Sequence, residues 1–517
     1  METSSRRDVL LPALCVLASG LLALALRPGI PLDETRYLQV AREMTWNGPW
    51  LLTLNGEPYG HKPPLLFWLG HLLGALGPGL ELGLRAIPAL ASALTVAVTA
   101  RLGRAHGAPL AGWVQAAFLA PLLYAHALYF DSLLACTVVL AVAAWSARRP
   151  ALAGVAASAA LLTKGPAAFL SLVPLLVAAD PVAGRALPGR IGRAAVCVLL
   201  ACLPLAAWAL TAGLLGGPEF QRELWWSQTA ERVAGPSSHD EPPWFFVVVL
   251  LVGTLPATLA FLGRRERAEP GTLRARLPWA IALPVLVFSF FPGKQPHYVL
   301  PLFPMLALLA AARLERTSGT RVRVATAALG LVFAGALTLA WTQRAERLER
   351  YGHHADALLA TRTFPALVLV GVLCGIAAVG LALAPRSGPR AWLGAGMLAT
   401  LGLVLPVEFA FGRLLLPTRI GAALTEEPEA RIATLRAQQA GLYLWMSGRR
   451  HIDDLREVDE LALWALRHPG GLVVFEDKLW RDEPTARALA ALDLVAVEHD
   501  LVRGTPSTLW RVHRHEP

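Results

Sequence analysis

Long apolar stretches alternate with short polar segments from the N-terminus to about residue 411. A helix needs about 20 mostly apolar residues to cross a lipid bilayer. Stretches of this kind lie at residues 8–26, 83–102, 108–124, 127–146, 151–163, 166–180, 190–214, 244–263, 278–292, 296–313, 322–341, 364–384 and 391–411. The stretches 151–163 and 166–180 are short enough to form one kinked or broken pair. The pattern predicts an all-α polytopic membrane protein with about 13 transmembrane helices.

The arginines give this predicted bundle an orientation, because cytoplasmic connections carry an excess of basic residues. If Arg6 and Arg7 are cytoplasmic and the sides alternate, every inside connection is basic, with Arg101/Arg104, Arg148/Arg149, Arg185/Arg190/Arg193, Arg264/Arg265/Arg267/Arg274/Arg276, Arg313/Arg316/Arg321/Arg323 and Arg386/Arg390. The outside segments are then 27–82, 125–126, 164–165, 215–243, 293–295, 342–363 and 412–517. No small-residue cleavage site follows the first span, so we expect it to be a retained anchor.

Two outside segments are long enough to fold. Segment 27–82 has a helical stretch at residues 34–46, a turn at Asn47-Gly48-Pro49 and an amphipathic run after Pro64, which predicts helices at the outer membrane surface. In segment 412–517, apolar runs typical of strands alternate with helical patterns. The runs are 442–446, 471–476 and 494–497, and the helical patterns are 458–467 and 484–492. We therefore expect a transmembrane domain over residues 1–411 and a small α/β domain over 412–517.

Composition narrows the class of protein. The chain is 55% hydrophobic and 16% charged, whereas soluble domains carry about 25% charged residues. This excludes a soluble globular enzyme, a disordered chain and a disulfide scaffold. The net charge of +10 is spread between the apolar spans, so it indicates topology and not a nucleic-acid partner. All five cysteines lie in apolar spans without ligand spacing, which predicts neither disulfides nor a metal site from them.

Lysine is rare, with four Lys against 43 Arg, and three of the four lie in short polar motifs. The first motif pairs Asp33-Glu34-Thr35-Arg36-Tyr37 with the string from Asn55 to Pro64, which contains Tyr59, His61 and Lys62. One interpretation is a solvated loop with weak local ion pairs. The other is a site in which Arg36 and Lys62 bind a phosphate and Asp33 contacts an acceptor. The two cations suit a phosphate because Arg binds two oxygens and Lys adds a point charge.

Two charged residues lie at the ends of apolar spans. Asp131 follows Tyr129-Phe130 at the outer start of a span, and an acid within a membrane segment costs roughly 2.5–3.5 kcal/mol. It therefore faces a cavity or a partner, or else it is a first-turn acid favoured by the helix dipole. Lys164 precedes a Gly165-Pro166 helix break. This lysine is either an anion contact or a snorkelling side chain.

Two further motifs carry polar residues at the outer side. The first runs from Pro292 to Tyr298 and contains Lys294 and His297; a lone His more often serves as a structural partner of a carbonyl. The second runs from Trp225 to Phe246 and contains Arg232 and His239. Its aromatic residues match a membrane-interface belt, while its charges are candidates to complete a polar cavity.

The alternation of sides puts five of these cations on one membrane face, namely Arg36, Lys62, Lys164, Arg232 and Lys294. This placement predicts an anionic-ligand pocket at the outer lipid boundary. A lipid-linked phosphate suits such a pocket, because its tail remains in the bilayer while its head group meets the cations.

Four strings resemble the aminoarabinose-transferase-like branch of glycosyltransferase family 39, which is related to the protein O-mannosyltransferases. They are Asp33–Tyr37, the Asn-Gly-Glu-Pro-Tyr-x-x-Lys-Pro-Pro string at 55–64, Leu-Thr-Lys-Gly-Pro at 162–166 and Gly-Lys-x-x-x-Tyr-x-Leu-Pro at 293–301. They follow the family's order through roughly the first 310 residues. The resemblance implies a GT-C fold, a polyprenyl-phosphate-linked sugar donor and transfer with inversion.

The resemblance also implies roles for residues. Asp33 on the first outer loop is the expected catalytic acidic residue, and Asp131 resembles the second acidic residue near the site. The expected donor-phosphate contacts are Arg36, Lys62, Lys164 and Lys294. The remaining cavity candidates are Glu34, Tyr59, His61, Arg232, His239, His297 and Tyr298.

Two positions depart from the family pattern. His61 stands where an acidic residue is frequent, so we expect no metal and no cofactor. The segment Ala230–Ala234 replaces a Glu-Asn-x-x-Arg-Phe pattern, which leaves the register of Arg232 open.

The expected function is that of a multi-pass glycosyltransferase of the bacterial inner membrane with a periplasmic active site. It would move a sugar from a polyprenyl-phosphate donor to an envelope acceptor, which is lipid A or another glycolipid or glycan. The alternatives are a protein O-mannosyltransferase-like enzyme, a lipid or polysaccharide transporter, and a non-catalytic protein that binds an envelope partner. The sequence has no internal repeat of the kind common in transporters.

Overall fold

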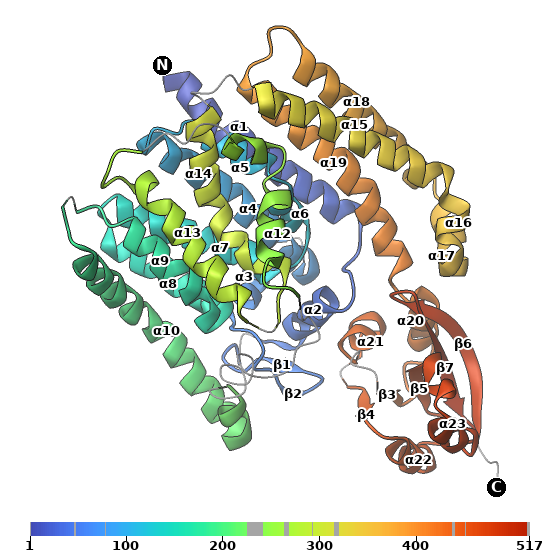
Figure 1. Ribbon diagram of the computed structural model, residues 1–517. Helices are drawn as coiled ribbons and strands as arrows, with labels where there is room; N and C mark the ends of the chain where they lie inside the picture. Colours follow the sequence, from blue (N-terminus) through green and yellow to red (C-terminus); the bar gives the residue numbers. More distant parts are fainter. Residues whose placement is uncertain are drawn as a thin grey trace. The chain divides into compact units, whose positions relative to one another are not determined.

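The computed structural model describes residues 2–45, 48–77, 79–182, 184–224, 241–262, 268–291, 293–314, 320–436, 440–449 and 451–513 (Figure 1). The chain forms two compact units. The first comprises Met1–Leu26, Gly60–Trp341 and Ala366–Pro406, and the second comprises Arg27–Tyr59, Thr342–Pro365 and Val407–Pro517. The second unit thus gathers residues from three segments that the arginine pattern places on the outer side. The division at Pro406 falls close to the predicted boundary at 411, whereas most of the first outer loop groups with the C-terminal residues.

The first unit is a bundle of helices. Its elements are α1 (Glu2–Leu26), α3 (Leu65–Ala75), α4 (Leu80–Ala105), α5 (Ala111–Ala117), α6 (Leu119–His126), α7 (Phe130–Ser146), α8 (Pro150–Lys164), η1 (Gly165–Ala168), α9 (Phe169–Ala178), α10 (Leu187–Arg222), α12 (Phe245–Gly253), η3 (Ala257–Leu262), α13 (Leu273–Ser289), η4 (Pro296–Leu302), α14 (Phe303–Leu314), α15 (Thr320–Thr342) and most of α18 (Thr363–Leu383) and α19 (Pro389–Leu414).

Eight helical stretches among the described residues are long and apolar enough to cross a membrane. They are Arg6–Leu26, Leu80–Ala105, Pro150–Ala178, Leu187–Arg222, Pro296–Leu314, Thr320–Thr342, Thr363–Leu383 and Pro389–Leu414. The other predicted spans overlap shorter pieces: span 108–124 overlaps α5 and α6, span 127–146 overlaps α7, span 244–263 overlaps α12 and η3, and span 278–292 overlaps α13, which ends at Ser289. The all-α polytopic architecture that the sequence predicts is therefore confirmed.

The pair 151–163 and 166–180 is broken, as the Gly-Pro dipeptide predicts. Gly165 ends α8 with φ 61° and ψ −144°, a conformation that is open almost only to glycine. Pro166 follows in η1 and cannot donate a helical hydrogen bond. This break fixes the position of Lys164, the last residue of α8.

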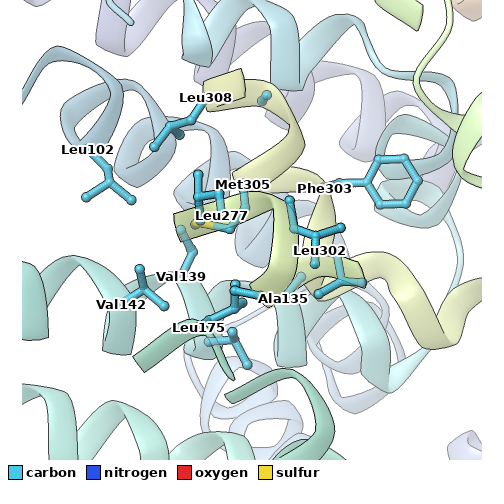
Figure 2. Packing of buried hydrophobic residues seen from close by; sticks show 14 of the residues in the cluster. Leu102, Ala135, Val139, Val142, Leu175, Leu277, Leu302, Phe303, Met305 and Leu308 are labelled. Atoms are coloured by element: carbon cyan, nitrogen blue, oxygen red, sulfur yellow. The ribbon is translucent and has the colours of Figure 1, made fainter. Parts of the chain in front are cut away.

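The core of the first unit is built from helices that meet through small and aliphatic side chains. Figure 2 shows part of this cluster, in which α4, α7, α9, α13, η4 and α14 contribute Leu102, Ala135, Val139, Val142, Leu175, Leu277, Leu302, Phe303, Met305 and Leu308. Ala153 and Ala157 of α8 are fully buried, and small residues at this spacing let membrane helices approach closely. The glycines of α15, α18 and α19 act likewise: a Cβ on Gly371 would lie 2.2 Å from the Gly402 carbonyl oxygen.

The second unit contains a five-stranded mixed sheet in the order β4-β3-β5-β7-β6. Its strands are β3 (Ile432–Leu435), β4 (Asp453–Leu455), β5 (Leu472–Glu476), β6 (Leu494–Val502) and β7 (Thr505–Val512). Strand β3 runs parallel to β4 and β5, while β7 is antiparallel to β5 and β6. The C-terminal helices are α20 (Thr418–Glu426), α21 (Ala440–Ser447), α22 (Val458–Arg467), η6 (Asp477–Arg481) and α23 (Glu483–Ala490).

Both faces of this sheet are covered, because side chains alternate along a strand. Ile432, Leu472 and Val474 pack in one cluster with residues of α20 and α21. Ala433, Val473 and Phe475 pack in the other cluster with residues of α22 and α23. The predicted small α/β domain is confirmed, and the pattern 458–467 is helix α22. One run was mispredicted: residues 442–446 lie in helix α21 and not in a strand, because a short apolar run does not distinguish a buried strand from a buried helix.

The outer loop residues of the second unit pack on its C-terminal part. They form α2 (Asp33–Glu43) and the short strands β1 (Thr53–Leu54) and β2 (Glu57–Pro58), and residues 342–365 add α16 (Arg344–Leu348), η5 (Glu349–Tyr351) and α17 (Gly352–Leu359). The Asn55 amide donates to the Ile452 carbonyl at 2.7 Å and accepts from its N–H at 2.8 Å. Arg42 donates to the Trp445 carbonyl at 3.0 Å. Of the predicted turn, Gly48 and Pro49 are described, while Trp46 and Asn47 lie outside the described residues.

Candidate functional site

The first unit holds a buried polar group around Asp131, which we call the Asp131 cluster and define as Lys62, Phe130, Asp131, Lys164, His297 and Tyr298. The Lys164 ammonium donates a hydrogen bond to Asp131 Oδ1. His297 Nε2 lies 3.7 Å from Asp131 Oδ2. The side chain of Asp131 is 3% exposed and that of Lys164 is 11% exposed. Three residues far apart in the sequence thus meet at one carboxylate.

Aromatic rings surround the cations of this cluster. Lys164 Nζ lies 4.6 Å from the ring centre of Tyr298, and Lys62 Nζ lies 5.7 Å from that of Phe130. At these distances the ring quadrupole attracts an ammonium ion. The ring of His297 also contacts Tyr129, with the ring centres 5.1 Å apart. The cluster therefore places cations in an apolar and aromatic surrounding.

Local sequence places each member of the cluster. Asp131 is the second residue of α7, where the helix dipole favours an acid. Lys164 is the last residue of α8, where the dipole favours a cation. His297 and Tyr298 lie in the 3₁₀ turn that Pro296 begins. Three helix ends with complementary charges are thereby brought together.

The second unit holds another polar group at the start of α2. Arg36 Nη1 lies 3.6 Å from Asp33 Oδ1, and the two side chains are 31% and 45% exposed. An ion pair as exposed as this one contributes about 0–1 kcal/mol. Both side chains are accordingly accessible to a ligand at little cost.

Glu34 differs from its neighbours because it is buried. Its oxygens accept hydrogen bonds from Arg27 Nη1 at 2.7 Å and Nη2 at 3.0 Å, and one also accepts from the Ile30 N–H at 2.9 Å. The side chains of Arg27 and Glu34 are 2% and 5% exposed, and Glu408 lies 3.9 Å from Arg27 Nε. Glu34, one of the cavity candidates, thus links Arg27 and Ile30, which precede α2, to that helix through hydrogen bonds.

Comparisons with known proteins agree with the resemblance seen in the sequence. No protein-family model matches the chain. An undecaprenyl phosphate-α-4-amino-4-deoxy-L-arabinose arabinosyl transferase of Sodalis glossinidius is 29% identical over 381 residues, which cover 66% of each chain. The enzyme of the same name from Edwardsiella ictaluri is 30% identical over 318 residues, or 56% of each chain. The chain thus matches less than two thirds of the length of these relatives.

Solved structures extend the likeness over nearly the whole chain. The crystal structure of ArnT from Cupriavidus metallidurans in the apo state superimposes with a TM-score of 0.75 at 20% identity, covering 97% of both chains. The chain has the aminoarabinose-transferase fold. A second structure, that of the same ArnT bound to undecaprenyl phosphate, gives a TM-score of 0.74 over the same coverage. The polytopic helical bundle that the sequence predicts is therefore confirmed as having this fold.

Within this aminoarabinose-transferase fold, the remaining candidates have different surroundings. Lys294 is buried and donates to the Glu241 carbonyl at 2.6 Å. Tyr59 is 3% exposed and its backbone N–H donates to the Leu52 carbonyl at 2.8 Å, while His61 is exposed. Arg232 and His239 lie outside the described residues.

Sequence reasoning missed two parts of these sites. Arg27 was not singled out, although Glu34, Leu38 and Ala41 are spaced as one helix face and all three are buried. That spacing indicates that Glu34 lies on the buried face of α2, where a carboxylate needs a cationic partner. The aromatic wall of Phe130 and Tyr129 was also missed as part of the site, since in sequence it continues an apolar stretch.

Proposed function

We propose that this protein is a membrane glycosyltransferase that moves a sugar from a polyprenyl-phosphate donor to an envelope acceptor with inversion at the sugar C1. The Asp131 cluster is the observation that carries the proposal. Partly buried cations among apolar helices suit a ligand that joins an anionic head to a hydrocarbon tail. The names of the relatives, and the ArnT structure bound to undecaprenyl phosphate, support this ligand class.

The donor phosphate is the leaving group of the proposed reaction. As the bond from the sugar C1 to the phosphate oxygen breaks, positive charge develops on the ring and negative charge on the phosphate. Cations already in place stabilise that departing charge without reorganisation, and one such contact is worth about 3 kcal/mol by comparison with oxyanion-hole losses. We assign this role to Lys62 and Lys164, and Arg36 at the exposed start of α2 is a further candidate phosphate contact.

Lys164 is suited to a phosphate although it is paired with Asp131. An ammonium carries three N–H donors, and the hydrogen bond to Asp131 Oδ1 uses one of them. Asp131 holds Lys164 in place, while the Tyr298 ring covers one side of the ammonium. In this proposal Asp131 acts on the donor through Lys164 and is a positioning residue.

Asp33 is assigned to the acceptor. Its exposed carboxylate at the start of α2 is able to take a proton from an acceptor hydroxyl, as a general base does. If the acceptor is a phosphate, that group is already nucleophilic and Asp33 orients it. The acceptor is an envelope glycolipid or glycan, with lipid A as one member of the class. The proposed location is the bacterial inner membrane, with the reaction at the periplasmic face.

The experiment is transfer by the full-length protein reconstituted in liposomes with a polyprenyl-phospho-sugar donor. Asp33→Asn is expected to abolish transfer, whereas Asp459→Asn, also a first-turn acid of a helix (α22), is the matched control and should retain it. Lys62→Ala is expected to weaken donor binding, and Lys478→Ala, at an exposed lysine, is its control. Wild-type turnover in Asp33→Asn, or unchanged donor affinity in Lys62→Ala, would contradict these assignments.

A further inference from the structure

Two histidines and an aspartate converge in the second unit, outside the residues assigned to transfer. His353 and His354 are consecutive residues of α17, and Asp500 lies in β6. The nitrogens and the carboxylate oxygen that they offer lie within 4.8 Å of one another. The side chains of His354 and Asp500 are 1% and 0% exposed, and that of His353 is 26% exposed. The group is therefore a buried cluster with one partly open side.

The hydrogen bonds of His354 determine where its proton lies. Nδ1 lies 3.0 Å from the Arg413 carbonyl oxygen, which accepts only, so Nδ1 carries the hydrogen. Nε2 then points at Asp500 Oδ1, which it contacts closely. In a neutral ring this arrangement sets a nitrogen lone pair against a carboxylate lone pair. A second proton fits between the two atoms as they lie, and a metal ion bound to both would take the place of that proton.

His353 adds a third ligand atom at the same oxygen. Its Nε2 lies 3.2 Å from Asp500 Oδ1, and the two imidazole ring centres are 4.2 Å apart. A single proton joins one histidine to the carboxylate, whereas a metal ion engages both histidines at once.

The backbone holds the carboxylate in place. Asp500 Oδ2 accepts from the N–H groups of Arg419 at 2.7 Å and Ile420 at 3.1 Å, at the start of α20, and Oδ1 accepts from the Leu501 N–H at 2.8 Å. These three amides hold the carboxylate in one orientation. Ligands oriented in this way by carbonyls and amides are typical of metal sites.

We propose that His353 Nε2, His354 Nε2 and Asp500 Oδ1 form a binding site for a divalent transition-metal ion of the Zn²⁺ type, with water completing the coordination at the open side of His353. Two imidazoles and one carboxylate are a ligand set that zinc takes. The ion would link α17 to β6 within the second unit. This proposal is independent of the transfer reaction.

The test uses the full-length protein in detergent, stripped with a chelator and then dialysed. Wild-type protein is expected to bind one equivalent of ZnCl₂ by calorimetry and elemental analysis, and zinc should raise its thermal midpoint. Asp500→Asn and His354→Gln should lose this binding. His451→Gln is the matched control, because His451 also faces an aspartate, Asp453 at 3.1 Å, in the same unit; it should bind zinc as wild type does.

His353→Gln keeps the test decisive if the two buried substitutions do not fold. It replaces the partly exposed ligand and leaves the His354–Asp500 contact intact, and we expect at least a roughly tenfold loss of zinc affinity, the lower end of what even supporting residues of metal sites contribute. Zinc binding in the His353→Gln variant equal to that of wild type would overturn the site. So would a wild-type thermal midpoint that zinc does not change, since a proton alone would then bridge His354 and Asp500.

Discussion

Replacement of Asp131 by Asn removes the negative charge at which Lys164 and His297 meet. Lys164, 11% exposed, would remain as a buried cation without its carboxylate, and loss of one partner of a buried pair costs about 3–5 kcal/mol. The Lys164→Gln substitution should lower the free energy of local opening by a smaller amount. Asp131 would then keep His297 Nε2 at 3.7 Å, and an imidazole at this distance is able to take up the proton that compensates the carboxylate.

The double variant Asp131→Asn with Lys164→Gln removes both charges together. The double variant should therefore lose less free energy of local opening than the sum of the losses in the two single variants. The difference is the coupling energy, which is about 0.5–3 kcal/mol for residues in contact. Hydrogen exchange measured on the amides of α7 and α8 gives the free energy of local opening at the pair itself. This readout is preferable to a global melt, because a chain of two units need not unfold in one step. Additive single effects, or a larger cost for Lys164→Gln than for Asp131→Asn, would refute the reasoning.

Two further substitutions test contacts within each unit. Arg27→Met should lower the free energy of unfolding of the second unit by about 3–5 kcal/mol, because it leaves the buried carboxylate of Glu34 without its cation. Adding Glu34→Gln should restore part of this stability, as measured by thermal unfolding. A fully additive loss in the double variant would argue against a buried pair. Gly165→Ala should cost about 1–3 kcal/mol, because alanine is strained at φ 61° and ψ −144°. Gly154→Ala is its control within α8, where a Cβ meets nothing within 4 Å, and it should stabilise the helix by up to about 1 kcal/mol. Equal effects of the two glycine substitutions on thermal unfolding would contradict a strained break at Gly165.

The bundle could be predicted from the sequence because lipid imposes a strong and local requirement. A segment without charges and about 20 residues long has few places to fold except across the bilayer. The Gly165-Pro166 break was equally visible, since no other dipeptide interrupts a helix so directly. The spans 108–124 and 244–263 fold as shorter pieces, because hydropathy reports apolar character and does not report where the backbone bends.

The sheet and the partners of individual charges could not be predicted in this way. Strands β3 and β7 were not foreseen, and their pairing depends on residues far apart in the chain. The same holds for the bond between Lys164 and Asp131, which are 33 positions apart, and for the contact of His353 and His354 with Asp500. Sequence reasoning found Asp131, Lys164 and His297 as separate motifs, but only the fold brings them to one carboxylate.

The choice of lysine in a chain rich in arginine follows from these surroundings. A guanidinium has five N–H donors in a fixed fork, and in an apolar site each donor without an acceptor costs free energy. The surroundings of Lys164 offer one carboxylate oxygen and the face of the Tyr298 ring, which suit a compact ammonium better than a fork. Lys62 likewise lies near the ring of Phe130, whereas Arg36, which is exposed at the start of α2, can satisfy its donors with water. Lysine thus stands beside aromatic rings in a partly buried setting, and the hydrogen bond to Asp131 uses one of the three N–H donors of Lys164.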